Sequence, residues 1–387
     1  MIQLTLKMVE IVAVFGTVSS AVYYLVCLWS AAGFLRERTL GKSTDSANNL
    51  PPISILKPLK GTDPEIYESL RSHCLQDYPE YEIVFGASDP GDPAIASVRQ
   101  LQREFPDRAI ELVICEKMLG ANVKVSNLAQ MSAVARHAHL IVNDSDIRVE
   151  RDYLRRVITP LSDPNVGLVT CLYRGAAQRT LGSRLEALGI ATDFCPSVLA
   201  ARQVEGIHFG LGSTLAFRSA ELEKIGGFTV LVDFLADDYE LGKRIADLGM
   251  AVQLSDVVVE TFLPAYSLRE FFAHQLRWAR GVRDSRGGGY AGLIVTFGLL
   301  WAVLAAIVSG GTPWAWGMLA GILAMRVAVA LVVGGAVLGD RRVGKNLWMT
   351  PIRDLVAVAV WIASFAGHTV TWRGDRFRLR QGKLIRL

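Results

Sequence analysis

Apolar and polar residues follow two different patterns along this chain of 387 residues. Between about residues 50 and 285, short apolar runs of strand length are separated by stretches whose apolar residues recur at helical spacing. Outside that region, long apolar runs carry very few charged residues. The pattern predicts a globular α/β domain in the middle of the chain and membrane-spanning segments on both sides of it.

Strands and helices alternate strictly in the first half of the middle region. The expected strands cover residues 53–61, 81–89, 110–116 and 140–146, and the expected helices lie between them at 63–79, 93–106 and 122–138. Asp63, with Pro64 after it, is expected to start the first helix. This order predicts a mostly parallel sheet with helices on both faces. Neither G-x-G-x-x-G nor a Walker A sequence follows the first strand, which argues against dinucleotide-binding and P-loop enzymes.

Four apolar segments predict the membrane helices. They cover about 11–35, 291–309, 313–338 and 354–371. Basic residues follow the first segment and lie between the third and the fourth, so the middle domain is expected to face the cytoplasm. Arg326, near the middle of the third segment, predicts a contact with another helix or with a lipid headgroup.

The C-terminal tail has its own pattern. It carries six Arg and Lys residues, and charged and apolar residues alternate around Gln381-Gly382, which predicts a small hairpin. The basic tail favours the cytoplasmic side, so one apolar segment is expected to be re-entrant or interfacial. The expected organisation is a membrane anchor with a linker over 1–49, a cytoplasmic α/β domain over 50–285, and a membrane region with a basic tail over 286–387.

Composition narrows the class of protein. Hydrophobic residues make up 51% of the chain, which is too many for an ordinary soluble enzyme. The net charge is +4, and the positive residues cluster near the membrane segments, which favours lipid headgroups over nucleic acid as the partner. The five cysteines form no C-x-x-C pair and no zinc spacing with histidine, which is typical of a reducing compartment without a structural metal.

Aspartates stand where two of the expected strands end. Asp89 follows one strand, and Asp144 and Asp146 follow another. Parallel sheets place their chemistry at the carboxyl ends of the strands, and residues i and i+2 of an extended chain point the same way. Two such carboxylates suit Mg²⁺ or Mn²⁺, which can neutralise a diphosphate leaving group. An Asx-rich turn after the strand is the alternative interpretation.

Two further groups follow along the chain. Asp237 and Asp238 precede an expected helix, where capping is the alternative role. His274, Arg277 and Trp278 share one face of a helix just before the membrane segments, where an interfacial anchor is the alternative. The occurrence of all these groups in one order favours a shared function.

With these motifs, the chain resembles the GT-A glycosyltransferases of family 2 type, and most closely the ceramide glucosyltransferase group, family 21. The similarity covers about residues 50–285. It rests on the opening stretch 51–85 and on "DPGDPAI", "NVKVSNL", "NDSDIRV", "GLVTCLYRG" and "ADDY" in the family's order. The resemblance implies a GT-A fold and inverting transfer of a sugar from a UDP-sugar to a membrane lipid, with Mg²⁺ or Mn²⁺ as cofactor.

The resemblance also implies roles for the aspartates. Asp89 matches the first aspartate of the family, which helps to hold the nucleotide. Asp144 and Asp146 match the D-x-D motif, with Asp146 at its metal-binding end. Asp238 matches the proposed general base, and Asp237 stands in place of the usual glutamate before it.

Basic and aromatic residues complete the implied site. Arg277 and Trp278 match the R-W of the (Q/R)-x-x-R-W motif, which is linked to diphosphate and acceptor binding. His274 departs from the motif, which has Gln or Arg at that position. Lys57 and Lys124 lie in matching segments and are expected to approach the diphosphate.

The acceptor is expected to be a lipid alcohol, because the R-W helix leads directly into the membrane segments. Residues 185–203 are apolar but interrupted by Asp193 and Pro196, and they are interpreted either as an interfacial part of the acceptor site or as a core helix. The acceptor is either ceramide or a related lipid, with UDP-glucose as donor, or the hopanoid bacteriohopanetetrol, with UDP-N-acetylglucosamine. Sequence forms typical of bacteria place the protein in the bacterial inner membrane. A processive polysaccharide synthase and a non-catalytic membrane scaffold are the remaining alternatives.

Overall fold

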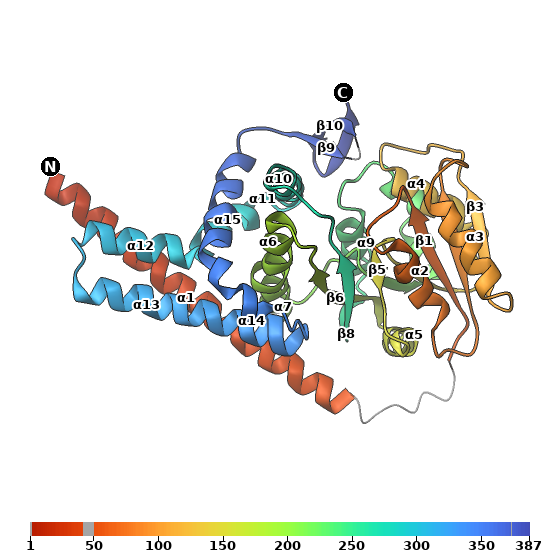
Figure 1. Ribbon diagram of the computed structural model, residues 1–387, viewed down its shortest axis with the longest axis horizontal. Helices are drawn as coiled ribbons and strands as arrows, with labels where there is room; N and C mark the ends of the chain where they lie inside the picture. The colour runs from red at the N-terminus through yellow and green to blue at the C-terminus, as the bar shows by residue number, and fades with distance from the viewer. Residues whose placement is uncertain (1, 42–49, 373) are drawn as a thin grey trace. The chain divides into compact units, whose positions relative to one another are not determined.

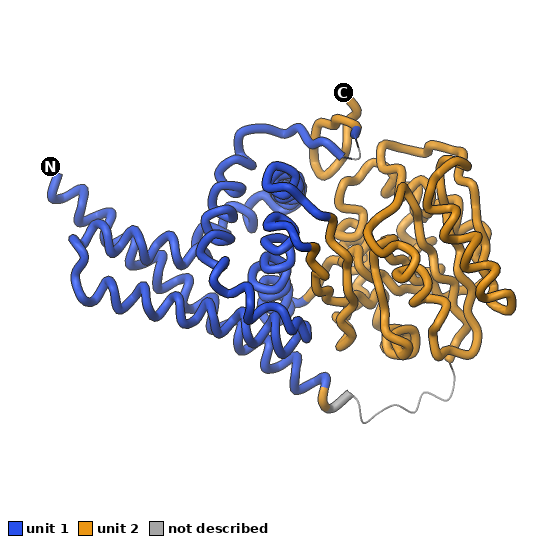
Figure 2. Tube along the Cα trace, in the orientation of Figure 1, with its two compact units in different colours: residues 1–38, 179–206, 265–374 blue, residues 39–178, 207–264, 375–387 orange. Residues whose placement is uncertain are grey.

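The computed structural model describes residues 2–41, 50–372 and 374–387 and divides the chain into two compact units (Figures 1 and 2). Unit 1 comprises residues 1–38, 179–206 and 265–374, and unit 2 comprises residues 39–178, 207–264 and 375–387. Both units are therefore discontinuous in sequence. Most of the linker expected before residue 50, and Arg373 of the basic tail, lie outside the described residues.

Unit 2 is built on a sheet of eight strands in the order β3-β2-β1-β4-β7-β6-β8-β5. These strands are β1 (Ile53–Leu59), β2 (Tyr81–Ala87), β3 (Ala109–Ile114), β4 (His139–Val142), β5 (Ile147–Arg148), β6 (Val166–Ala176), β7 (Leu215–Arg218) and β8 (Ala251–Phe262). Neighbours β3, β2, β1 and β4 run parallel, as do β6 and β8. β7 and the short β5 run antiparallel to their neighbours. The expectation of a mostly parallel sheet is confirmed.

Helices flank this sheet. They are α2 (Ile66–Cys74), α3 (Ala94–Glu104), α4 (Val123–Ser132), α5 (Tyr153–Ile158), α8 (Ser219–Lys224) and α9 (Asp237–Asp247), with the 3₁₀ turns η1 (Thr159–Ser162) and η3 (Phe228–Leu231). Every residue of β1 and β2 is buried, as expected for strands covered on both faces. The first helix begins at Ile66 and not at Asp63, because Glu65 before it has a left-handed φ of 54°, which a right-handed helix cannot include. The Asp63 carboxylate accepts a hydrogen bond from Ser145 Oγ at 2.5 Å.

The strand register brings four loops to one edge of the sheet. Leu59 at the end of β1 is level with Ala87 at the end of β2, and Leu56 is level with Val142 at the end of β4. β7 is antiparallel to β4, with Leu215 opposite Val142, so the loop that precedes β7 lies at the same edge. The residues just after β1, β2 and β4 and just before β7 are therefore neighbours, which is where chemistry is expected in such sheets.

The last residues of the chain form the expected hairpin. β10 (Asp375–Arg380) pairs antiparallel with β11 (Lys383–Arg386). Gln381 and Gly382 between them have φ values of 51° and 78°. Positive φ at both central residues is what a tight two-residue hairpin turn requires. Figure 2 shows these residues in the colour of unit 2.

Unit 1 is almost entirely helical. Its elements are α1 (Ile2–Gly41), α6 (Leu181–Gly189), η2 (Ile190–Phe194), α7 (Cys195–Val204), α10 (Leu268–Ser285), α11 (Gly287–Gly292), η4 (Leu293–Thr296), α12 (Gly298–Val308), α13 (Pro313–Val329), η5 (Ala330–Val337), α14 (Val343–Asn346), η6 (Leu347–Met349), α15 (Thr350–Ser364) and the strand β9 (Thr369–Trp372). The stretch 185–203 lies within α6, η2 and α7, where the π-helical η2 joins two helices without a break.

Among the described residues, three helical stretches are long and apolar enough to cross a membrane: Ile2–Thr39, Pro313–Val337 and Val343–Ser364. A fourth candidate is the pair Gly287–Thr296 and Gly298–Val308, which is bent by 50° and fits either a broken span or a re-entrant loop. By length and composition, these segments mark a membrane protein. The bend falls in the segment 291–309, and the re-entrant or interfacial segment stays a prediction.

Candidate active site

Lys124 links two of the predicted aspartates in unit 2. It lies in the first turn of α4, where the Asn122 side chain caps the helix by accepting from Val125 N. The Lys124 ammonium lies 2.9 Å from Asp144 Oδ1 and 3.1 Å from Asp237 Oδ2. Burial disfavours its charged form, but the carboxylates around it outweigh burial and raise the pKa of Lys124. Lys124 is therefore a permanent positive charge among these aspartates.

Asp238 is held by backbone donors. Gly212 N donates to Asp238 Oδ2 at 2.7 Å, and Tyr239 N donates to Oδ1 at 2.8 Å. Burial, followed by the charge of Asp237, raises the pKa of Asp238 to about 6 despite the opposing charge of Lys124. A carboxyl group in this state is ionised at neutral pH and is a stronger base than an exposed aspartate.

Gly212 marks the point where the predicted groups converge. A Cβ atom added there would lie 3.0 Å from Asp144 Oδ2, 3.2 Å from Asp238 Oδ2 and 3.7 Å from Lys124 Nζ. The aspartates come from the loop after β4 and from the first turn of α9, nearly a hundred residues apart in sequence. The fold thus brings the D-x-D and D-D motifs together around one backbone position.

Asp146 and Lys57 lie beside this group. Thr261 Oγ1 donates to Asp146 Oδ2 at 2.5 Å, and burial, followed by the charge of Asp144, raises the pKa of Asp146 to about 6. Lys57 is fully buried on β1, and its ammonium donates to the backbone oxygen of Asp144 at 3.0 Å. Burial lowers the pKa of Lys57 to about 7. Its position makes Lys57 a support for the D-x-D loop.

The charges of these six side chains fit a divalent cation. Four carboxylates (Asp144, Asp146, Asp237 and Asp238) lie near two amines (Lys57 and Lys124). With a pKa of about 7, Lys57 is only partly charged at neutral pH, so at least two negative charges lack compensation from within the group when all four carboxylates are ionised. Among the described residues, no three His, Cys, Asp or Glu side chains form a ready cage for a metal. Mg²⁺ typically binds through one or two carboxylates and completes its shell with water and substrate phosphates, which suits the D-x-D pair.

Asp89 lies apart from these contacts. It is exposed after β2, where its Oδ1 accepts from Gly91 N at 2.8 Å. The neighbouring Asp92 accepts from Gly61 N at 2.9 Å and from Ala94 N at 2.9 Å, so it ties the loop after β1 to the start of α3. Sequence reasoning missed Asp92, although it belongs to the "DPGDPAI" motif.

Asn143, which the sequence analysis also missed, is fully buried between β4 and the D-x-D motif. Its Nδ2 donates to Ser213 O at 2.7 Å and to Tyr153 Oη at 2.9 Å. It therefore fixes the loop that presents Gly212. A polar residue that ends a buried apolar strand was the available signal.

The R-W helix α10 belongs to unit 1. It begins with a capping box in which Ser267 and Glu270 exchange hydrogen bonds. His274 stacks on Tyr266 with ring centroids 5.2 Å apart, and it also contacts Trp278 at 5.8 Å. Trp278 is 41% exposed and meets Phe194 edge to face. Arg277 is half-buried.

A buried polar network extends from this helix toward the candidate membrane spans. Glu186 Oε2 lies 3.5 Å from His274 Nδ1 and accepts from Gln275 Nε2 at 2.8 Å. Gln275 Oε1 accepts from Arg353 Nη2 at 3.0 Å, and Arg353 also pairs with Asp193 at 3.1 Å.

Arg326 joins the same network from α13. It is 5% exposed and pairs with Asp193 and with Asp354, the latter at 2.6 Å. The helix contact expected for Arg326 is therefore present. Asp193, which interrupts the apolar stretch 185–203, is the partner shared by Arg326 and Arg353.

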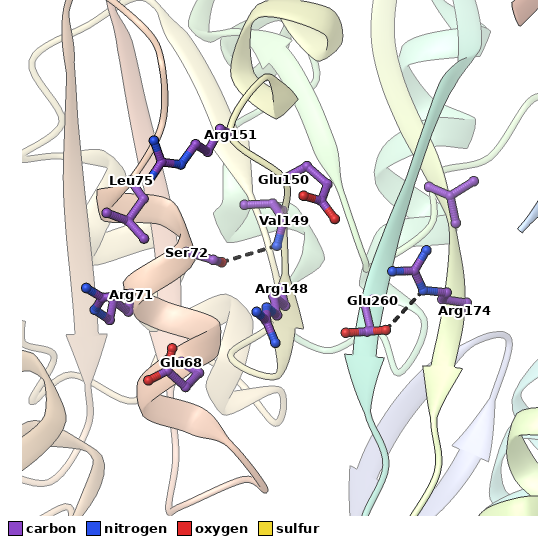
Figure 3. Close-up of a pocket in the computed structure, with 11 residues that line it drawn as sticks. Glu68, Arg71, Ser72, Leu75, Arg148, Val149, Glu150, Arg151, Arg174 and Glu260 are labelled. Carbon is purple, nitrogen blue, oxygen red and sulfur yellow. Dashed lines mark hydrogen bonds and ion pairs between the residues drawn. The ribbon is translucent and has the colours of Figure 1, made fainter. Parts of the chain in front are cut away.

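A separate cavity of about 360 Å³ lies in unit 2 between α2, the residues around β5, and the strands β6 and β8 (Figure 3). Four arginines and three glutamates line it, and Arg174 pairs with Glu260 at 3.0 Å. The mixed charges give it no clear preference for an anion. Its described lining contains none of the predicted site residues.

Comparisons with known proteins identify the family of this chain. The sequence profile described as Glycosyl transferase family 21 matches residues 12–385. Ceramide glucosyltransferase 1 of Caenorhabditis elegans is 22% identical over 397 residues, which cover 97% of this chain and 82% of the relative. Ceramide glucosyltransferase 3 of the same organism is 23% identical over 400 residues, which cover 98% and 83%.

Among solved structures, a mannosyltransferase from Pyrobaculum calidifontis, in complex with GDP-Man and Mn²⁺, is similar to this chain. It is 23% identical, with a TM-score of 0.54, and the match covers 92% of this chain and 99% of that one. This likeness confirms the expected GT-A fold. It also shows that a transferase of this fold binds a divalent cation.

Proposed function

Because the chain belongs to glycosyl transferase family 21, we propose that it moves a sugar from a UDP-sugar to the hydroxyl of a membrane lipid. The ceramide glucosyltransferases among its relatives support a lipid acceptor and favour glucose and ceramide. The candidate membrane spans support an acceptor that is presented from a bilayer. The basic flanks of the apolar segments support a catalytic domain on the cytoplasmic side of a bacterial inner membrane.

The observation that carries the proposal is the convergence of Asp144, Lys124 and Asp238 around Gly212. Inverting transfer needs a single base and no covalent nucleophile. In our proposal, Asp238 takes the proton of the lipid hydroxyl as its oxygen bonds to the anomeric carbon and the bond to UDP breaks. An α-linked UDP-sugar then gives a β-glycoside.

The other residues would bind the donor and shape the site. Asp144 and Asp146 would hold Mg²⁺ or Mn²⁺, and that cation would neutralise the departing diphosphate. Lys124 holds the Asp144 and Asp237 carboxylates in place, and Lys57 supports the Asp144 backbone. We assign Asp89 to the uridine side of the donor.

The sequence motif adds the residues of α10. Arg277 supplies a guanidinium suited to a diphosphate, and Trp278 offers an exposed ring suited to the acceptor. His274 and Asp237 are assigned to the acceptor side. The His274 ring is held by its stacking on Tyr266 and its contact with Trp278.

A product assay tests this proposal. The purified protein, in detergent with Mn²⁺ or Mg²⁺, is offered UDP-glucose, UDP-galactose or UDP-N-acetylglucosamine together with ceramide, diacylglycerol or bacteriohopanetetrol. We expect the mass of one hexose on ceramide. An N-acetylhexosamine on bacteriohopanetetrol would replace the acceptor with a hopanoid and leave the mechanism unchanged. Chains of several sugars would indicate a processive synthase, and no product from any pair would contradict the proposal.

A further inference from the structure

The C-terminal hairpin of unit 2 pairs with the segment that leads to Asp238. Leu384 N donates to Asp233 O at 2.7 Å, and Leu235 N donates to Gly382 O at 3.0 Å. Phe234 and Lys383 face each other as an antiparallel bridge between these two hydrogen bonds. The end of the chain thus extends along residues 233–235, which lie between η3 and α9.

Side chains reinforce this pairing. The Lys383 ammonium lies 5.4 Å from the centre of the Phe234 ring, and the Arg244 guanidinium of α9 lies 5.7 Å from the same centre. A cation over an aromatic face is attracted by the ring's negative face. In the hairpin, the side chains of Phe377, Leu379 and Leu384 are buried, so it is packed as well as hydrogen-bonded.

The same segment is bound from a second direction by the residues before α4. Asn122 N donates to Val232 O at 2.6 Å, and Ala121 N donates to Asp233 Oδ1 at 2.9 Å. Asn122 Nδ2 donates to Phe234 O at 2.8 Å and reaches Asp237 Oδ1 at 3.3 Å. Residues 232–235 are therefore held between the hairpin and the start of the helix that carries Lys124.

This arrangement has a consequence for Asp238. The segment 232–236 belongs to no helix of α type and to no sheet strand, so its backbone groups depend on these neighbours for hydrogen bonds. Asp237 and Asp238 follow it directly, in the first turn of α9. A shift of the segment would move the Asp238 carboxylate relative to Gly212. Displacements of about 1 Å in such sites can lower rates by about a hundredfold.

We propose that the C-terminal hairpin, through Leu384, Gly382 and Lys383, is a positioning element that holds Asp238 in place for proton removal. The inference rests on the proposed function for the role of Asp238, but the pairing itself is independent of any substrate. The hairpin touches the segment before the base and none of the predicted donor-binding residues among its described contacts. It should therefore affect turnover more than donor binding.

The sharpest test compares two substitutions at Leu384 in the full-length protein. Leu384 N–H points to Asp233 and not to β10, so Leu384→Pro removes the docking hydrogen bond and leaves the hydrogen bonds of the hairpin. Leu384→Ala removes the same buried side chain but keeps the N–H. We expect kcat of the Pro variant to be about tenfold below that of the Ala variant, with UDP-sugar affinity equal within a factor of about two.

Substitutions at Lys383 cover the case in which the Pro variant does not fold. Lys383→Met should lower kcat about threefold through the lost cation–ring contact, and Lys383→Arg should restore it. Arg378→Met is the matched control, because this exposed hairpin cation has no described contact with residues 232–236 and should leave kcat unchanged.

Amide hydrogen exchange separates this inference from the proposed function. Leu384→Pro should raise exchange at Leu235 at least tenfold over Leu384→Ala, with or without activity. If wild-type protein makes no glycolipid while this exchange difference is present, the proposed function fails and the docking stands. Equal exchange and equal kcat in the two variants would overturn the inference. A parallel loss of donor affinity and kcat would also overturn it, since the hairpin would then support the whole domain.

Discussion

Gly212 donates its backbone N–H to Asp238 at 2.7 Å, and a side chain at Gly212 would lie 3.0 Å from Asp144. Both contacts involve the ends of side chains, which can move by a few tenths of an ångström. The glycine is therefore needed for the position of two carboxylates more than for folding.

We expect Gly212→Ala to fold with nearly normal stability and to lose at least about tenfold in kcat, because both carboxylates are displaced. Gly344→Ala is the control, since an added Cβ there meets nothing within 4 Å. Rates of glycolipid formation, with thermal unfolding measured in parallel, check this. A Gly212→Ala enzyme with wild-type kcat would show that the two carboxylates do not need their present spacing.

The pH dependence of transfer should report the raised pKa of Asp238. A base with a pKa of about 6 loses its charge as the pH falls through that value, so kcat/KM at pH 5 should be about a tenth of its plateau. Asp146 titrates in the same range, and UDP-sugar affinity measured across it separates donor binding from the base. A fall of kcat/KM centred near pH 4 would contradict the raised pKa of Asp238.

The raised pKa of Asp238 also makes the stability of the fold depend on pH. The folded protein holds the Asp238 proton more tightly than the unfolded chain between about pH 4 and 6. This carboxylate therefore lowers the stability of the fold as the pH rises through that window, and its full cost is present at neutral pH. The burial that makes Asp238 a stronger base therefore also lowers the free energy of unfolding at neutral pH.

Removal of divalent cations should abolish transfer. Chelation is expected to weaken UDP-sugar binding as well as turnover, because the surplus negative charge near Asp144 then repels the diphosphate. Added Mn²⁺ or Mg²⁺ should restore both. Asp146→Asn should raise the cation concentration needed for half-maximal activity at least about tenfold. Full activity after exhaustive chelation would show that transfer needs no divalent cation.

Arg326 should matter for stability more than any exposed arginine. Arg326→Met removes the buried guanidinium that the half-buried Asp193 and Asp354 share. Breaking a fully buried pair costs about 3–5 kcal/mol, and we expect the lower end of that range because Asp193 keeps Arg353 as a partner. The control is Arg341→Met, at an exposed position after the same helix. Thermal unfolding in detergent compares the two variants, and equal midpoints would show that the network contributes little.

Local sequence patterns were sufficient for much of this fold. Apolar runs such as 53–59 are buried on both faces, and a buried strand between helices has few alternatives to a parallel sheet. The tight turn at Gln381-Gly382 could also be predicted from the local sequence. The D-x-D and D-D motifs could be singled out because they interrupt apolar runs at the ends of strands and helices.

Contacts between distant segments could not be predicted in this way. The helix start expected at Asp63 was wrong: α2 begins at Ile66, and the Asp63 carboxylate accepts a hydrogen bond from Ser145, 82 residues away. Nothing local to Gly212 marks it as the meeting point of Asp144 and Asp238. The pairing of Leu384 with Asp233 likewise depends on where the fold brings the C-terminal hairpin. The alternation of charged and apolar residues in the tail predicted the hairpin but not the segment 233–235 with which it pairs.

The most direct test of Asp238 as the base is a paired measurement on Asp238→Asn. The amide keeps the shape of the side chain but cannot take a proton from the acceptor. We predict that UDP-sugar affinity stays within about threefold of wild type, while glycolipid formation falls by a factor of about 10²–10⁴. Turnover equal to that of the wild-type enzyme would contradict the assignment of Asp238 as the base.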